Sequence, residues 1–254
     1  MTKNNFFVKS IKEINLTINS LLRNNLNKLN SNNFFKITKS HKFFLLLLLL
    51  IIFSIFYLSI PNTYNKTEIS KRLSDKLQNK YNLNFNLSQN FNYNFLPRPH
   101  FIFNNSTISK DQKEISKIEE LKIYISLNNL FSYKNFRVQN LILEKSNFFL
   151  DNNNYDFFIN LLDGDFQENK LFIKNSNIFY KNKDDEVLFI NKILNMEYFY
   201  DKKNLKNKVI SNNEIFNLPY SIELNKDDIK KKIFFKLNLN FLKLKLNNEL
   251  DFSK

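Results

Sequence analysis

The sequence predicts a mainly β protein, with a single N-terminal transmembrane helix, a short amphipathic helix, and then an elongated antiparallel meander curved into an open groove. Three observations predict this fold class. An uncharged apolar run occupies residues 43–60, an apolar residue recurs every fourth position over residues 67–81, and apolar and polar side chains alternate over much of the rest. The predicted divisions are a basic cytoplasmic tail (1–42), the transmembrane helix (43–60), a linker and helix (61–81) and a β-groove domain (82–254).

The composition argues against most enzyme classes. The 254 residues include no cysteine, which excludes disulfides, a catalytic thiol and Cys-based zinc or iron–sulfur sites. The two histidines, His41 and His100, are far apart in the sequence, which argues against a multi-histidine metal site. Because Gly164 is the one glycine, the chain has neither a Gly-rich phosphate loop nor a nucleophile elbow. We therefore expect no enzymatic activity, no catalytic residue, no metal site and no cofactor.

The acidic clusters are expected to form turns rather than ion sites. Asp163–Gly164–Asp165 lacks the further oxygen ligands and the terminal Glu of an EF-hand loop. Asp184–Asp185–Glu186 and Asp227–Asp228 are expected to be solvated loop tips. His100 has no Asp or Ser partner in a recognisable arrangement, so we do not expect it to act as a general base.

The tail before the apolar run carries half of the net charge. It contains eight Lys or Arg residues against Glu13 alone, which is +7 of the total of +14. Seven apolar residues between positions 8 and 29 share one helical face: Ile11, Ile14, Ile18, Leu21, Leu22, Leu26 and Leu29. The tail is either an amphipathic helix on the inner leaflet or a partly ordered segment whose asparagines weaken the helix. Elsewhere the basic residues mostly alternate with apolar ones, so nucleic-acid binding is not expected.

The apolar run at residues 43–60 reads FFLLLLLLIIFSIFYLSI. About 18 residues at roughly 1.5 Å each span about 27 Å, close to the hydrocarbon thickness of a bilayer. Pro61 is expected to end the helix. Lys36, Lys39 and Lys42 precede the run without a nearby acid, whereas the basic residues after it are mixed with acids. This asymmetry favours an N-terminus inside and a C-terminal domain across the membrane.

Beyond the anchor, the pattern changes from period four to period two. Thr67 is expected to cap a helix in which Ile69, Leu73, Leu77 and Tyr81 form one apolar stripe. Alternating strands follow, and the two prolines at positions 96–100 must interrupt the sheet. Further strands are predicted over 121–127, 138–143, 171–180, 187–190, 208–211, 220–224 and 236–240. A change of parity at Phe241–Leu242 predicts a bulge or a turn there.

A single apolar face on successive strands must be covered. A closed sandwich would cover it with other protein side chains, and the chain's 29 phenylalanines and 11 tyrosines could simply fill such a core. Alternatively, the acyl chain of a lipid could lie along an open groove. The alternation itself does not distinguish the two arrangements.

Several segments resemble the AsmA-like family of Gram-negative bacteria. The resemblance starts with the helix ISKRLSDKL and continues, after an alternating strand, through FLPRPHFIFNNSTI and KIEELKIYISLNNLFSYK. The segment LFIKNSNIFYKN at residues 171–182 is similar to a further rung of the family's sheet. The larger members are similar to bridge-like lipid transfer proteins. The family often has glycine at the turns near Asn82 and Gln89, and Asn82 can replace it because asparagine tolerates the left-handed conformation.

The resemblance implies a location and a ligand. The protein would be single-pass in the bacterial inner membrane, with its N-terminus cytoplasmic and its C-terminal domain periplasmic. It would handle phospholipid or another acyl-chain lipid in support of outer-membrane assembly or homeostasis. The residues expected to line the groove are Leu83, Phe85, Leu87, Phe91, Tyr93, Phe95, Phe101, Phe103, Leu121, Ile123, Ile125 and Leu127.

Two further expectations bear on partners. About a dozen strands at roughly 4.8 Å each give a groove of about 55–60 Å, which is too short to cross a periplasm alone. The protein would then pass lipid to a partner, act locally or assist a larger relative. The alternative function is a structural or scaffolding β-domain that binds another envelope protein through a sheet edge.

Overall fold

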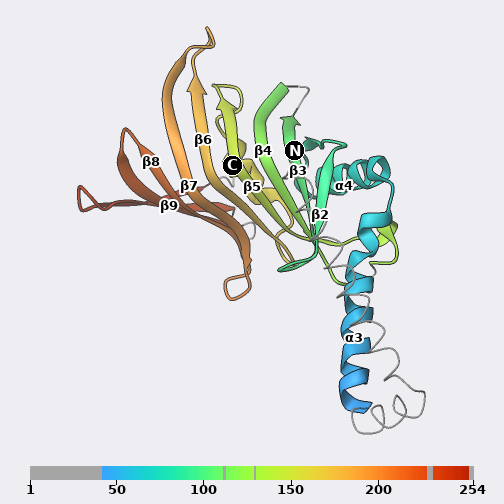
Figure 1. Ribbon diagram of the computed structural model, residues 1–254. Coiled ribbons are helices and arrows are strands. Elements are labelled where there is room, and N and C mark those ends of the chain that lie inside the picture. The colour runs from blue at the N-terminus through green and yellow to red at the C-terminus, as the bar shows by residue number, and fades with distance from the viewer. Residues whose placement is uncertain (1–41, 111–112, 129, 228–230, 252–254) are drawn as a thin grey trace, which may run out of the picture. The chain divides into compact units, whose positions relative to one another are not determined.

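The computed structural model describes residues 42–110, 113–128, 130–227 and 231–251 (Figure 1). The chain divides into two compact units, residues 1–56 and residues 57–254. The amphipathic helix predicted over residues 8–29 lies outside the described residues.

Helix α3 (Lys42–Ser59) covers the apolar run almost residue for residue. The side chains from Phe44 to Phe56 are all exposed, which suits a helix surrounded by lipid rather than by protein. The segment Phe44–Thr63 is long and apolar enough to cross a membrane. As predicted, the α-helix ends just before Pro61, which is the second residue of the short 3-10 helix η1 (Ile60–Thr63).

Helix α4 (Lys66–Tyr81) is present as the sequence predicted, but its N-terminal cap is different. The side chain of Asn65, not that of Thr67, accepts hydrogen bonds from the backbone N–H groups of Thr67 at 2.9 Å and Glu68 at 3.4 Å. Threonine was expected because it precedes the apolar stripe, yet it is the second residue of the helix, two positions after the cap. At the other end Asn82 adopts the left-handed conformation with φ 54°, as expected of an asparagine that replaces the turn glycine of the AsmA-like family.

The rest of the chain forms one open sheet that does not close into a barrel. The strand order is β1-β3-β4-β5-β6-β7-β8-β9-β10-β11, and β2 also pairs with β3. The strands are β1 (Asn84–Asn86), β2 (Phe91–Asn94), β3 (His100–Lys110), β4 (Lys113–Ile125), β5 (Val138–Leu150), β6 (Lys170–Lys181), β7 (Val187–Asp201), β8 (Lys206–Ile215), β9 (Leu218–Asp227), β10 (Lys232–Leu239) and β11 (Leu244–Asp251). The parity change at Phe241–Leu242 is the turn between β10 and β11.

Apart from β1 and β2, which both pair with β3, the described sheet departs from a meander at one point. Strands β5 and β6 are neighbours but run parallel, so residues 151–169 must cross from one end of the sheet to the other. This crossover contains the short helices α5 (Phe157–Asn160) and η3 (Leu161–Asp163). The predicted antiparallel sheet is confirmed as a whole, and β5–β6 is the parallel exception among the described pairs, because alternation within single strands carries no information about which way the next strand runs.

Strands β3 to β7 bend along one common row. In each of them two successive inward-facing residues are three positions apart instead of two. The inward-facing positions therefore switch between odd and even residue numbers at this row, and the apolar side chains stay on the same face. The residues in this row are Asn105, Glu119, Lys145, Asn175 and Leu194, and three of them, Asn105, Lys145 and Asn175, have positive φ. Because the parity changes occur at the same level, the strands stay in register while the sheet curves.

The outward face of the sheet is polar and ion-paired. Lys122 pairs with Glu120 and Glu144 on β4 and β5, and Lys208 pairs with Glu223 on β8 and β9. Their hydrogen bonds to lysine lower the pKa of both Glu120 and Glu223. The outward face is therefore charged and solvated, in contrast to the inward face.

Candidate functional site

The inward face of the sheet is apolar from β3 to β11. Strand pairing shows its continuity: Phe101 lies opposite Ile123, and Leu121 lies opposite Leu143. The same face continues through further opposite pairs: Leu141–Leu171, Leu171–Tyr198, Tyr198–Val209, Val209–Leu224, Leu224–Phe235 and Leu237–Leu246. The apolar stripe therefore crosses the whole sheet, and the question is which part of it is covered.

Helix α4 covers the N-terminal part of this face. Its residues Ile69, Leu73 and Leu77 are buried in one core with the inward residues of β1 to β6. Ser70 donates a hydrogen bond to the Leu87 carbonyl at 3.2 Å, and Ser74 donates one to the Phe85 carbonyl. These bonds occupy backbone groups at the outer edge of the sheet, so α4 caps both the face and that edge.

The residues that the sequence predicted as groove lining lie mostly beneath this cover. Nine of the twelve are buried in the core: Leu83, Phe85, Leu87, Phe91, Phe101, Phe103, Leu121, Ile123 and Ile125. Tyr93 and Phe95 are half-buried, and Leu127 is exposed in the loop after β4. Contact between the buried nine and lipid stays a prediction, and it would require α4 to separate from the sheet.

The crossover covers the middle of the face. The Tyr198 hydroxyl on β7 donates to the Phe158 carbonyl at 2.9 Å, and the Asn207 amide on β8 donates to the Leu162 carbonyl at 2.6 Å. A third contact between the crossover and the sheet is the ion pair of Asp163 with Lys226 on β9. The cover provided by the crossover therefore extends no further than β9 among the described residues.

Beyond the crossover the apolar face is open. Its side chains on β9 and β10 are half-buried, and those on β11 are exposed, with Leu244 and Leu246 each 45% accessible and Leu250 52%. We call these residues the open face: Ile222, Leu224, Ile233, Phe235, Leu237, Leu239, Leu244, Leu246 and Leu250. The alternation of residues 236–240 predicted a strand here, but it gave no signal that this strand, rather than 83–127, would remain uncovered.

Asp227, expected at a solvated loop tip, instead ends β9 in a largely buried position. Its carboxylate lies 3.3 Å from the Lys206 ammonium on β8. A register that places β8 beside β9 brings these two charges together, which a local reading of the sequence could not anticipate. Asp227 is therefore a strand-end ion pair and not a free loop carboxylate.

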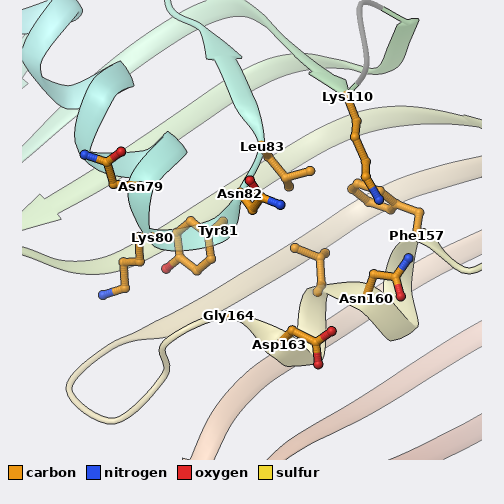
Figure 2. A pocket seen from close by; sticks show the side chains of 11 residues that line it. Asn79, Lys80, Tyr81, Asn82, Leu83, Lys110, Phe157, Asn160, Asp163 and Gly164 are labelled. Carbon is orange, nitrogen blue, oxygen red and sulfur yellow. The ribbon is translucent and has the colours of Figure 1, made fainter.

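A polar cavity lies between the end of α4 and the crossover (Figure 2). It has a volume of about 320 Å³, and its lining includes the side chains of Lys80, Asn82, Lys110, Asn160 and Asp163. Burial lowers the pKa of Lys80. The cavity offers amide and ammonium donors, but no nucleophile beside a base, so it suits a small polar group better than an acyl chain.

His100 is a structural residue. It is buried, its ring stacks on Tyr124 with centroids 4.8 Å apart, and Nδ1 lies 2.7 Å from the Arg98 carbonyl oxygen. Within the described residues, no three His, Asp or Glu side chains lie close enough together to hold a metal ion.

The sequence profile of the AsmA family matches residues 34–252. The match begins in the tail, includes α3, and extends through β11. A search of curated proteins finds no match to the chain.

Proposed function

The chain belongs to the AsmA family, and on that premise we propose that it is a bacterial inner-membrane protein whose open face holds or passes the acyl chains of phospholipid. Its N-terminus would be cytoplasmic, and its sheet would lie in the periplasm and support outer-membrane assembly or homeostasis. The family and the one membrane-length apolar helix in the described part of the chain are consistent with a membrane-anchored protein.

One observation carries this proposal: the apolar face continues beyond the elements that cover it. Three of the four inward positions of β11 are leucines that are 45–52% accessible, and Asn248 is the fourth. Such side chains would normally be covered by protein or lipid, because exposing apolar surface to water is unfavourable. The open face is a strip of branched aliphatic side chains with one aromatic ring. Apart from Asn248, which lies opposite Phe235, such a surface offers an acyl chain dispersion contacts rather than directional polar contacts, as expected of a site that holds lipids without selecting among headgroups.

Photo-crosslinking from β11 tests the proposal. Leu246 faces inward and Asn247 faces outward, and both are exposed on the same strand. With benzoylphenylalanine at position 246, the full chain in bacterial membranes should form phospholipid adducts detectable by mass spectrometry, whereas position 247 should form few. Equal adduct yields at the two positions, or none at position 246, would contradict acyl-chain binding by this face.

The second candidate function is a scaffold that binds an envelope protein through a sheet edge. It is favoured by the different states of the two edges: α4 caps the edge at β1 and β2, whereas β11 pairs with β10 and with no other described strand. Crosslinking from Asn247 would then give one discrete protein adduct and no lipid adduct from Leu246.

A further inference from the structure

The loop between β4 and β5 is attached to the C-terminal end of the apolar helix. The Tyr57 hydroxyl donates to the Leu127 carbonyl at 2.7 Å and accepts from the Leu130 N–H at 3.4 Å. The Tyr57 ring lies 5.0 Å from the Phe131 ring, centroid to centroid. Tyr64, just after the helix, donates to the Leu130 carbonyl at 2.9 Å. Two tyrosines therefore hold this loop beside the end of the helix.

A second segment, the proline turn before β3, is held at the same place. The Tyr93 hydroxyl donates to the Leu58 carbonyl at 2.7 Å. The Pro99 carbonyl accepts from the N–H of Ile125 at 3.0 Å, which joins the turn to the start of the β4–β5 loop. Both segments therefore lie at the level of residues 57 and 58.

These two segments expose large apolar side chains flanked by basic ones. Leu96 is 70% accessible, Leu127 53% and Phe131 71%. Arg98, Lys134 and Arg137 are exposed in the same segments, whose sequences contain no Asp or Glu. We call these six residues the interfacial patch. Exposed apolar groups beside unopposed cations are typical of surfaces that lie in the headgroup region of an anionic bilayer.

The depth of the patch follows from Tyr57. This residue is near the C-terminal end of the segment Phe44–Thr63, which is long and apolar enough to cross a membrane, so a spanning helix places it close to the boundary of the apolar layer. Groups in contact with Tyr57 must then lie near the boundary between acyl chains and headgroups. Tyrosines are enriched at that boundary, and the three tyrosines that hold the two loops fit this preference.

We propose that the interfacial patch binds the surface of an anionic phospholipid bilayer. Leu96, Leu127 and Phe131 enter the outer part of the acyl layer, while Arg98, Lys134 and Arg137 contact lipid phosphates. This inference rests on the proposed membrane anchor but not on acyl-chain binding by the open face. Its consequence is that the end of the sheet bearing the β4–β5 loop is held on the bilayer by a second contact besides α3.

Tryptophan fluorescence provides a direct test, because the chain contains no tryptophan of its own. Phe131→Trp in the full chain would be reconstituted into vesicles of phosphatidylcholine and phosphatidylglycerol that carry bromine on their acyl chains. Phe241→Trp is the matched control, since Phe241 is 74% accessible and lies in a turn at the opposite ends of the strands. We expect Phe131→Trp to be quenched at least about twofold more than Phe241→Trp, with a blue-shifted emission.

Flotation of the vesicles separates the two ways in which the inference can fail. If the protein floats with the vesicles and the two tryptophans are quenched equally, the anchor stands and the interfacial patch is wrong. If the protein does not float, the anchor is wrong and the patch fails with it. Addition of salt should reduce the quenching of Phe131→Trp while the protein still floats, because salt screens Arg98, Lys134 and Arg137 from the lipid phosphates.

Discussion

At the scale of single residues, asparagine and lysine take positions that glycine takes in most proteins. Ten described residues with side chains have positive φ, four of them asparagines, while the one glycine has an ordinary φ. Gly164 relieves crowding instead: a Cβ there would lie 3.1 Å from both the Phe166 and Tyr81 rings, which would have to shift by a few tenths of an ångström. Asparagine tolerates the left-handed region better than other non-glycine residues, which explains how a chain almost without glycine builds these bends.

Lys145 is the bend residue least suited to its conformation. It has φ 53° in the middle of β5, where asparagine occupies the corresponding places at Asn105 on β3 and Asn175 on β6. Lys145→Asn should therefore stabilise the protein by about 0.5–1 kcal/mol and raise the Tm by about 1–4 °C, because its exposed ion pair with Glu119 contributes little. Thermal unfolding in detergent measures this. Lys117→Asn, on the exposed side of β4 without a positive φ, should not stabilise; equal stabilisation by both would refute the explanation.

The serines after these bends are not equivalent. The Ser176 hydroxyl accepts from the buried Ser146 N–H at 3.0 Å and donates to the Lys174 carbonyl at 2.8 Å. The buried hydroxyl of Ser106 has no hydrogen-bond partner among the described residues. Ser176→Ala should therefore cost about 1–3 kcal/mol, whereas Ser106→Ala should be neutral or stabilising. Unfolding by urea would show the difference, and a larger loss for Ser106→Ala would contradict the assigned hydrogen bonds.

At the scale of secondary-structure elements, the local sequence pattern predicted which elements form but not how all of them are connected and paired. The period-four stripe predicted α4, and the alternation predicted most strands, because both periodicities are set by the local geometry of the backbone. The crossover between β5 and β6 was not predicted. Its buried residues Phe157, Leu161 and Phe166 have no regular spacing, and the parallel pairing that it permits depends on residues 30 positions apart.

Substitutions at the N-terminus of α4 test whether Asn65 or Thr67 caps this helix. Asn65 accepts both first-turn hydrogen bonds, while Thr67, the residue expected from the sequence, lies inside the helix. Asn65→Ala should lower the free energy of unfolding by about 0.5–2 kcal/mol, and Asn65→Asp should restore it. Thr67→Ala serves as the matched control and should change stability little. If Thr67→Ala costs as much as Asn65→Ala, the assignment of the cap to Asn65 fails.

At the scale of the whole sheet, the open, one-sided architecture could be predicted, but the location of the uncovered part could not. Alternation marks every apolar face in the same way, whether protein or lipid will cover it. Residues 83–127 were selected because they carry the strongest alternation and the resemblance to the AsmA-like family, yet most of them are beneath α4. Which strands remain open depends on the length of the crossover and the strand order, and both are long-range properties.

The local stability of each strand should depend on whether other elements pack on its apolar face. Strands β3 to β6 are buried under α4 and the crossover, whereas β10 and β11 have a neighbour in the sheet but no described helix or crossover segment packed on their apolar face. Amide hydrogen exchange of the full chain in detergent should therefore be faster in β10 and β11 than in β3 to β6, on the order of tenfold or more, because opening them exposes less additional apolar surface.

In phospholipid nanodiscs, exchange in β9 to β11 should slow while that in β3 to β6 stays unchanged, since acyl chains would supply the missing cover. Uniform exchange across the sheet in detergent would show that cover does not set local stability, and unchanged exchange of β9 to β11 in nanodiscs would argue against lipid on the open face.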